Sequence, residues 1–315
     1  EDGIIFLGVP NAFVKEWLGN KYHKFILKAL RDLNENVRGL EYTVCKEIIN
    51  TEQINEMRTT RPVTNELVPE GLYINKEDNL NPKYTFESFI IGSFSELAHA
   101  AAQAVIKNPG VIYNPLFIYG PTGLGKTHLV QAIGNFIKKH HPEKRVYYMT
   151  SEKFSTDYIT SLQSGKINEF KERHRKYDFL IMDDIQFLSN KEKTQEELFH
   201  VFNTLYDNNK QIIFSSDKHP NYIPDIEERL KSRFAAGMIV DISLPDYESR
   251  MEILREKSRN NNFFLSDESV SLISSSIEGN IRELEGMLNS IIMQSQLKNR
   301  ELGLHEIKAI LKNNS

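Results

Sequence analysis

A single cysteine, Cys45, is present in the 315 residues, so no disulfide can form within the chain. This composition is typical of a reducing compartment, and we therefore expect a cytoplasmic protein. Long apolar runs are missing as well, which excludes a membrane-spanning helix of ordinary length. The histidines show no spacing typical of metal ligands, so the sequence predicts no histidine and cysteine cluster around a transition metal.

The sequence also lacks an excess of positive charge. The chain carries 39 Lys and Arg residues against 43 Asp and Glu residues, and its net charge is −4. A general basic field that would attract nucleic acid is therefore excluded, and any contact with DNA must come from local patches. By contrast, hydrophobic residues make up 40% of the sequence, and its length allows two or three domains with cores of their own.

The most informative motif is Gly120-Pro-Thr-Gly-Leu-Gly-Lys-Thr127, a complete G-x-x-x-x-G-K-T phosphate loop. The apolar residues 115–119 before it have the pattern of a strand, and residues 128–137 after it have helical spacing. A glycine turn that matched by chance would lack this strand–turn–helix context. The motif therefore predicts that the chain binds a nucleoside triphosphate.

Each part of this loop has a role in holding a nucleotide. Gly123 and Gly125 let backbone N–H groups approach the β-phosphate at the N-terminus of the following helix. Lys126 can reach the β- and γ-phosphates, and the hydroxyl of Thr127 can bind Mg²⁺. The residues that we expect to contact ATP or ADP are Gly120, Gly123, Gly125, Lys126, Thr127 and His128.

A second motif indicates where the metal lies. Residues 177–184 form an apolar run that ends in Asp183 and Asp184, as a buried parallel strand with two carboxylates at its C-terminal end would. Because ligands bind at that end of open α/β sheets, Asp183 is expected to hold Mg²⁺ beside Thr127, and Asp184 to orient or activate water. A strand followed by an ordinary turn is the alternative. The 57 positions from Lys126 to Asp183 favour the functional interpretation, since they leave room for one strand and its helices.

The N-terminal part has a different organisation. Residues 3–9 and 37–44 are strand candidates, and residues 10–33 are amphipathic. Such a β-α-β piece is too small for a comfortable core, so residues 1–50 are expected to be part of an N-terminal interaction domain. Residues 51–80 are polar, contain two prolines and show no apolar period, which is typical of a flexible linker. Since the sequence starts with glutamate rather than methionine, we expect a fragment whose first elements lie upstream.

From residue 81 onward the pattern is that of an α/β protein. Strand candidates alternate with helical stretches, and this alternation predicts a parallel sheet within residues 81–244. Residues 245–315 have helical spacing throughout and are expected to form a small helical lid and the start of a connector helix. The strand candidates are residues 115–119, 145–149, 178–183, 211–215 and 238–242, and the lid helices are residues 246–260, 267–276, 279–298 and 304–312.

Several segments share the motifs of one family: Asn81–Phe86, Tyr113–Gly120, Gly123–Leu129, Asp183–Phe187, Gln195–Glu197, Ser215–Asp217, Arg229–Phe234 and Asn280–Gly286. In these the chain resembles the DnaA family of bacterial chromosomal replication initiators, which are ATPases of the AAA+ class. The resemblance implies an AAA+ parallel-sheet core with an all-helical lid, preceded by a small KH-like α+β segment and a linker. The family's helix-turn-helix domain for double-stranded origin boxes would follow residue 315, so this chain is not expected to recognise such boxes.

The resemblance implies roles for four further residues. Asp217 corresponds to the residue that senses the γ-phosphate, although on the sequence alone it could also be a turn aspartate. Arg233 corresponds to the arginine finger that completes a neighbouring subunit's site, and Arg229 to an arginine in subunit contacts. Without the resemblance, either arginine would be a solvated charge on a helix. Arg282 corresponds to the sensor that ties the lid to the nucleotide.

Contacts with DNA are expected to be local. The resemblance places a helical insertion, residues 152–175, along the axis of an assembled filament, and implies that single-stranded DNA is held through its backbone. A solvated lysine turn is an equally good interpretation of residues 191–194. The residues for which the resemblance implies DNA contact are Ile159, Lys191, Lys193 and Thr194.

Two positions depart from the family's pattern. Lys193 stands where some members carry Arg, which keeps the charge but loses the bidentate geometry. Ser95 stands where Asn is common near the adenine, so base recognition would depend more on backbone contacts. A third position, Phe13, corresponds to a phenylalanine through which the family contacts the replicative helicase. A core aromatic is the slightly favoured interpretation there, since Trp17 lies four residues on and would share its helix face.

The function implied is that of an ATP-dependent initiator of chromosomal replication. ATP-bound subunits would stack head to tail into an open helical filament on single-stranded origin DNA and recruit the helicase, whereas ADP-bound subunits would assemble poorly. Asp184 stands where motor enzymes of the class usually carry Glu, so hydrolysis is expected to be slow and to act as an off-switch.

Three alternatives stay open at this point. An AAA+ helicase loader or transposition-helper ATPase shares the core motifs but lacks the arrangement of residues 1–80. A motor or remodelling ATPase would hydrolyse ATP rapidly when stimulated by nucleic acid. A regulatory adaptor would bind nucleotide and fail to bind single-stranded DNA.

Overall fold

The computed structural model describes residues 4–9, 23–33, 37–44 and 77–314. The chain divides into two compact units, residues 1–67 and 68–315, and each is described by itself. Within the described ranges no helix combines the length and the apolar character needed to cross a membrane. Phe13, which the sequence predicted as a helicase contact, and most of the predicted linker lie outside the described residues.

In the N-terminal unit, β1 (Ile4–Val9) pairs in parallel with β2 (Gly39–Val44), so that Ile4 lies opposite Gly39. Both strands agree with the sequence-based expectation. The helix α2 (His23–Leu33) packs its apolar side against this ribbon, and Leu40 and Tyr42 are buried under it. Arg31 at the end of α2 donates hydrogen bonds to the carbonyls of Val37 and Arg38, which fixes the approach to β2.

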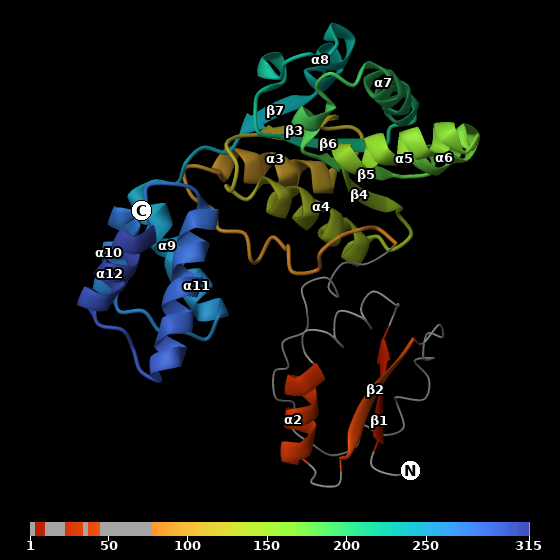
Figure 1. The fold of residues 1–315 in the computed structure, drawn as a ribbon. Helices are drawn as coiled ribbons and strands as arrows, with labels where there is room; N and C mark the ends of the chain where they lie inside the picture. The colour runs from red at the N-terminus through yellow and green to blue at the C-terminus, as the bar shows by residue number, and fades with distance from the viewer. Residues whose placement is uncertain (1–3, 10–22, 34–36, 45–76, 315) are drawn as a thin grey trace. The chain divides into compact units, whose positions relative to one another are not determined.

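The second unit is built on a five-stranded sheet whose strands are all parallel (Figure 1). The strand order is β4-β5-β6-β3-β7, so β3 lies inside the sheet with partners on both sides. Each of the five predicted strands is confirmed within one residue at either end. They are β3 (Leu116–Tyr119), β4 (Val146–Thr150), β5 (Phe179–Asp183), β6 (Gln211–Ser216) and β7 (Met238–Asp241).

Helices cover both faces of this sheet (Figure 1). Alternate residues of β3 show the two layers: Leu116 and Ile118 belong to one buried cluster and Phe117 to the other. The first cluster lies under α3 (Glu96–Lys107) and α4 (Lys126–His140). The second lies under four helices, α5 (Ser151–Gln163), α6 (Ile167–Arg175), α7 (Glu192–Asp207) and α8 (Glu228–Phe234). Burial on both faces explains why the strands are near-continuous apolar runs in the sequence.

The last residues of the segment predicted to be a linker, residues 51–80, pack against the core. Asp78 is buried, and its carbonyl accepts a hydrogen bond from the backbone N–H of Tyr148 at 2.9 Å. Leu80 is also buried and packs on Gly134 of α4, where a side chain would collide with it. The core therefore extends upstream of residue 81.

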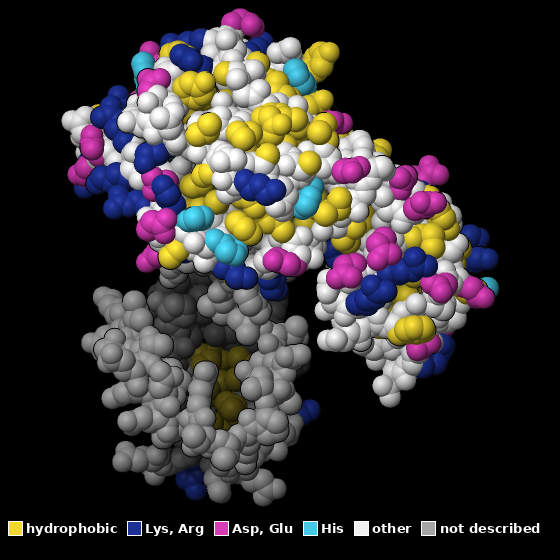
Figure 2. All heavy atoms as spheres, turned by 180° about the vertical axis from the view of Figure 1, so that it is seen from behind, with side chains coloured by type: hydrophobic (Ala, Val, Ile, Leu, Met, Phe, Trp, Pro, Cys, Tyr) yellow, Lys and Arg dark blue, Asp and Glu magenta, His cyan; other side chains and the backbone are white. Residues whose placement is uncertain are grey.

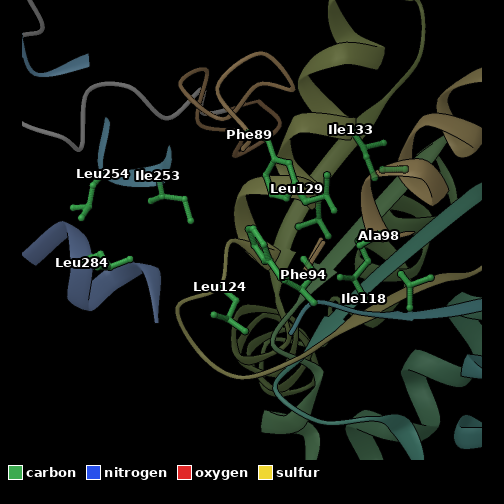
Figure 3. Close-up of a cluster of buried hydrophobic side chains, with 14 of the residues drawn as sticks. Phe89, Phe94, Ala98, Ile118, Leu124, Leu129, Ile133, Ile253, Leu254 and Leu284 are labelled. Carbon is green, nitrogen blue, oxygen red and sulfur yellow. The ribbon is translucent and has the colours of Figure 1, made fainter. Parts of the chain in front are cut away.

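The last part of the chain is the predicted helical lid. It consists of α9 (Tyr247–Asn260), α10 (Asp267–Ser276), α11 (Ile281–Lys298) and α12 (Leu304–Asn314). Three of these helices begin at a polar residue, Asp246, Ser266 or Asn280, whose side chain accepts a backbone N–H of the first turn. Figure 3 shows Ile253, Leu254 and Leu284 of the lid grouped together, with Leu124 of the phosphate loop between them and the core, and all four belong to one buried cluster.

One buried side chain ties stability to pH. His174 on α6 is fully buried among Phe154, Phe170 and Tyr177, and one ring nitrogen lies 2.8 Å from the carbonyl oxygen of Phe170. Its Nε2 has no hydrogen-bond partner among the residues that the structure describes. Burial lowers the pKa of His174 to about 4, because the charged ring would lose its hydration there.

The neutral form of His174 is thus favoured in the folded chain. Above pH 6.5 the ring is neutral in both states, and as the pH falls toward 4 only the unfolded chain takes up the proton. We expect this group to remove up to about 3 kcal/mol of unfolding free energy over that window. Urea unfolding followed by circular dichroism at pH 7 and pH 4.5 measures it. His174→Phe should show a smaller loss than wild type, and equal losses in the two proteins would contradict the assignment.

Candidate nucleotide-binding site

The phosphate loop lies at the C-terminal end of β3 and leads directly into α4. Gly120 has a φ of 149°, and a Cβ there would lie 2.1 Å from the carbonyl oxygen of Ile242. Only glycine therefore fits between the loop and the segment after β7. Gly125, with φ 92°, immediately precedes Lys126, so the unpaired N–H groups of the first turn of α4 face the loop.

Lys126 is held beneath this loop. Its ammonium donates hydrogen bonds to the carbonyls of Gly120 and Pro121, at 2.7 and 2.8 Å, and the residue is buried. Burial lowers the pKa of Lys126, while the nearby carboxylates of Asp183 and Asp184 act in the opposite direction. The lysine is thus a charged donor kept within reach of anything that the loop encloses.

Asp183 and Thr127 come together as the sequence predicted. The Thr127 hydroxyl donates to Oδ2 of Asp183 at 2.7 Å, and the Tyr148 hydroxyl donates to the same oxygen at 2.9 Å. The Ser215 hydroxyl hydrogen-bonds to the other oxygen, Oδ1. Burial and the neighbouring Asp184 raise the pKa of Asp183, and the hydroxyl donors oppose that rise. A carboxylate and a hydroxyl side by side are hard oxygen ligands, so the site fits Mg²⁺.

Tyr148 and Ser215 had no signal in the sequence as metal-site residues. They reach Asp183 because β4 and β6 are the two neighbours of β5. In the register of these strands, Tyr148 pairs with Ile181 and Phe214 with Met182. That arrangement depends on strand order, which the spacing of residues does not give.

Asp184 follows Asp183 in a left-handed conformation, with φ 58° and ψ 49°. Its backbone N–H donates to Oδ1 of Asp183 at 3.1 Å and to the Ser215 hydroxyl at 3.3 Å. Asp217, at the end of β6, donates its N–H to Oε1 of Gln186 at 3.2 Å. One carboxylate oxygen of Asp217, Oδ1, is buried, and no described residue donates a hydrogen bond to it. The acidic pair and Asp217 therefore lie at the ends of the neighbouring strands β5 and β6.

A cavity of about 340 Å³ opens around the phosphate loop. Core residues on one side and lid residues on the other line it, including His128, Phe187, Lys257, Arg282 and Glu285. Arg282 reaches it from the first turn of α11, as predicted for a lid sensor. Lys257 and Glu285, which form an ion pair at 2.5 Å, were not singled out from the sequence. Because two parts of the fold form its walls, the cavity changes shape if the lid moves.

His128 lines this cavity, and its ring is held by the segment before α3. One ring nitrogen, Nε2, lies 2.9 Å from the carbonyl oxygen of Thr85 and 3.2 Å from the hydroxyl of Ser88. The ring stacks on Tyr84, with centroids 5.0 Å apart, and burial lowers its pKa. His128 of α4 thus connects the start of this helix to the segment before α3. Ser95 is buried and does not line the cavity.

The lid is joined to the phosphate loop itself. The backbone N–H of Ile281 donates to the carbonyl of Gly123 at 3.0 Å. A Cβ on Gly123 would lie 2.6 Å from Oδ1 of Asn280, the N-cap of α11, and Gly123 has a φ of 82°. This glycine therefore permits both the turn of the loop and the close approach of the lid.

The two predicted arginines lie away from this chain's own cavity. Arg229 and Arg233 are on α8, with the Arg229 guanidinium 4.9 Å and that of Arg233 5.6 Å from the Phe199 ring centroid. The fully buried Gln195 of α7 fixes the start of this helix: its amide donates to the carbonyl of Asp225, and its carbonyl accepts from the N–H of Glu227. The arginines are thus presented on an anchored helix away from the phosphate loop that lies in the same chain.

The predicted DNA-contacting residues fall into two groups. Ile159 is 47% exposed on α5, and Lys193 is exposed in the first turn of α7, next to the N-cap Lys191. Thr194 is 4% exposed, so the prediction of a side-chain contact with DNA at this position is not supported by its burial. Figure 2 shows Lys and Arg side chains gathered at the edge of the core where α5 and α6 lie; α6 contributes Lys171, Arg173 and Arg175.

The profile described as the bacterial DnaA ATPase domain matches residues 80–241. The chromosomal replication initiator protein DnaA of Geotalea daltonii is 43% identical over 312 residues, which cover 99% of this chain and 69% of that protein. The chain belongs to the DnaA family. DnaA of Deinococcus deserti is likewise 43% identical to this DnaA-family chain, over 95% of it and 66% of that protein.

Solved structures agree with this assignment to the DnaA family. Domain III of Thermotoga maritima DnaA superposes with a TM-score of 0.72 at 42% identity, covering 74% of this chain and 98% of that one. A replication initiator DnaA bound to AMPPCP and single-stranded DNA gives 0.65 at 42% identity, over 70% of each chain. The RuvB branch migration motor of Thermotoga maritima gives 0.55 at 15% identity, which shows likeness of fold alone. The predicted AAA+ fold class is confirmed.

The contact between lid and phosphate loop leads to a test. Gly123→Ala places a Cβ against Asn280 and in a conformation that costs about 1–3 kcal/mol, so ATP binding should weaken at least about tenfold. Gly165→Ala is the matched control, because Gly165 also has a positive φ, 69°, but a Cβ there would meet no atom within 4 Å. Titration with a fluorescent ATP analogue measures both variants. Wild-type affinity in Gly123→Ala would show that lid docking does not depend on this glycine.

Proposed function

We propose that this chain is the ATP-binding and assembling part of a chromosomal replication initiator. The observation that carries the proposal is the cavity shared by phosphate loop and lid, together with Thr127, which lines the cavity and donates a hydrogen bond to the buried Asp183. Lys126 would bind the β- and γ-phosphates, and Thr127 and Asp183 would hold Mg²⁺. When bound, the metal supplies charge neutralisation at the phosphate oxygens.

The proposed slow hydrolysis of ATP depends on the placement of Asp184. Its carboxylate lies beside the buried Asp183 at the floor of the cavity, where it would orient the attacking water. Aspartate is one methylene shorter than the glutamate usual in motor enzymes of this class, so the water would be held less well and turnover would be slow. Multiple-turnover phosphate release measures this. A rate above about 1 per second would favour the motor interpretation instead.

Nucleotide state would control assembly. Arg233 would act in trans as the arginine finger, completing the site of the next subunit, and Arg229 would support the same contact. The placement of both on α8, away from their own chain's cavity, is what such a role requires. An interface of this head-to-tail kind closes into a ring or continues as a helical filament. Because Arg282 of the lid lines the cavity, loss of the γ-phosphate would change the lid contact and with it the assembly.

Single-stranded DNA is the proposed ligand of the assembled form. The DnaA structure solved with AMPPCP and single-stranded DNA is the relative that supports this. In this chain the contacts would come from Ile159 on α5 and from Lys191 and Lys193 at the start of α7. Recruitment of the replicative helicase through the N-terminal unit, with Phe13 as a contact, completes the proposal.

An assembly that depends on Arg233 can be tested directly. Binding of fluorescent oligo-dT should require ATP or a non-hydrolysable analogue, rise cooperatively with protein concentration and weaken at least about tenfold in Arg233→Ala. Lys231→Ala is the control on the same helix, since in the described part of the chain Lys231 forms its one ion pair with the exposed Glu228, at 2.8 Å. This variant should bind as wild type does.

Lys193→Ala separates DNA contact from assembly in the same experiment. It should weaken oligo-dT binding and flatten its dependence on salt, because one phosphate contact is lost, while ATP-dependent assembly measured by light scattering stays intact. Binding that ignores the nucleotide would favour the helicase-loader interpretation. Nucleotide binding without any DNA binding would favour the adaptor.

A further inference from the structure

Gln186 occupies a bridging position in the nucleotide site. It lies on the short 3-10 helix η3 (Ile185–Leu188), directly after the acidic pair, and lines the cavity. Its side-chain amide donates to Oδ1 of Asp184 at 2.9 Å, and its side-chain carbonyl accepts the backbone N–H of Asp217 at 3.2 Å. One side chain thus connects the ends of β5 and β6.

The backbone of Asp184 is fixed without help from Gln186. Its N–H is bonded to the Asp183 carboxylate and the Ser215 hydroxyl, and its carbonyl accepts from the Ser151 hydroxyl at 2.6 Å. These contacts leave two free rotations, about χ1 and χ2, that decide where the carboxylate points. Among the described residues, Gln186 is the only hydrogen-bond donor to that carboxylate.

We propose that Gln186 is a positioning residue for ATP hydrolysis. Its side chain orients the Asp184 carboxylate, and the position of the Asp217 backbone N–H determines the orientation of that side chain. Holding Oδ1 leaves Oδ2 of Asp184 to face the attacking water. The Asp217 N–H sets the rotamer of Gln186 from the other side. A displacement of the loop after β6 therefore reaches the water-orienting carboxylate through a single side chain, without a change in the sheet.

This role is distinct from nucleotide binding. The phosphate contacts expected of Lys126 and the metal contacts expected of Thr127 and Asp183 do not pass through Gln186. Its loss should therefore change the rate of the chemical step and leave affinity alone, since a misplaced group at the reacting centre can cost about a hundredfold in rate. The inference rests on the proposed function, because it concerns the hydrolysis step of the same site.

Two variants test the role. Gln186→Glu keeps an oxygen for the Asp217 N–H but replaces the amide donor by a carboxylate that repels Asp184; Gln186→Leu removes both hydrogen bonds at similar size. Both should lower kcat about 10- to 100-fold, with the KM for ATP and the Kd of a fluorescent ATP analogue unchanged within about twofold. Gln296→Glu, an exposed glutamine of α11, is the matched control for the charge change and should hydrolyse ATP as wild type does.

The outcomes are distinguishable. Unchanged or faster turnover in both variants, with the wild-type chain binding and hydrolysing ATP, would overturn the role of Gln186 alone. A KM that rises in step with the fall in kcat/KM would also overturn it, since that pattern marks lost binding rather than lost positioning. A wild-type chain that neither binds nor hydrolyses ATP would overturn both this role and the proposed function. Thermal unfolding of each variant confirms that the fold is kept.

Discussion

The arrangement of the site depends on one buried carboxylate. Asp183, at the end of β5, accepts hydrogen bonds from Thr127 of α4, Tyr148 of β4 and Ser215 of β6. Three elements are thereby joined to β5 at its two carboxylate oxygens. An ionised carboxylate out of reach of water costs several kcal/mol unless such donors replace its hydration. The same donors hold the ends of the strands in register with the first turn of α4. Asp183, the expected Mg²⁺ ligand, therefore also helps to fix the position of the phosphate loop through Thr127.

The lid depends on the phosphate loop in turn. Its contact with the core includes the backbone hydrogen bond from Ile281 to Gly123, and Asn280 packs where any other residue at 123 would carry a side chain. Arg282 follows immediately and lines the cavity. A nucleotide in this cavity would therefore touch the loop and the lid at once. On the opposite face of the sheet, Gln195 fixes the start of α8, which carries the two arginines. The lid, expected to act on the nucleotide of its own chain, and α8, expected to act on a neighbouring subunit, are thus held by separate contacts.

Much of this was predictable because the relevant signals are local. The apolar runs of the five strands, the glycine loop and the helical spacing of the lid are short patterns, and each matches its element. The meeting of Thr127 and Asp183 followed from the rule that parallel strands present their C-terminal ends together. Tyr148, Ser215 and Gln186 could not be found in this way, since their contacts depend on strand order and rotamers. The burial of Thr194 was missed for a similar reason: the turn suggested exposure, but the inner face of α7 begins there.

The position of β3 has a consequence for how the molecule opens. This strand is paired on both edges, with β6 and β7, and Leu116, Phe117 and Ile118 are fully buried. Its amides can exchange with solvent only when the sheet itself comes apart, so the loop that follows is carried by the most protected part of the fold. The lid is joined to the core by side-chain packing and the Ile281–Gly123 hydrogen bond rather than by strand pairing, so we expect it to detach in a sub-global opening at a lower free energy than the sheet. Local opening of the folded chain is therefore expected to expose a bound nucleotide on the side of the lid, while the phosphate loop keeps its conformation.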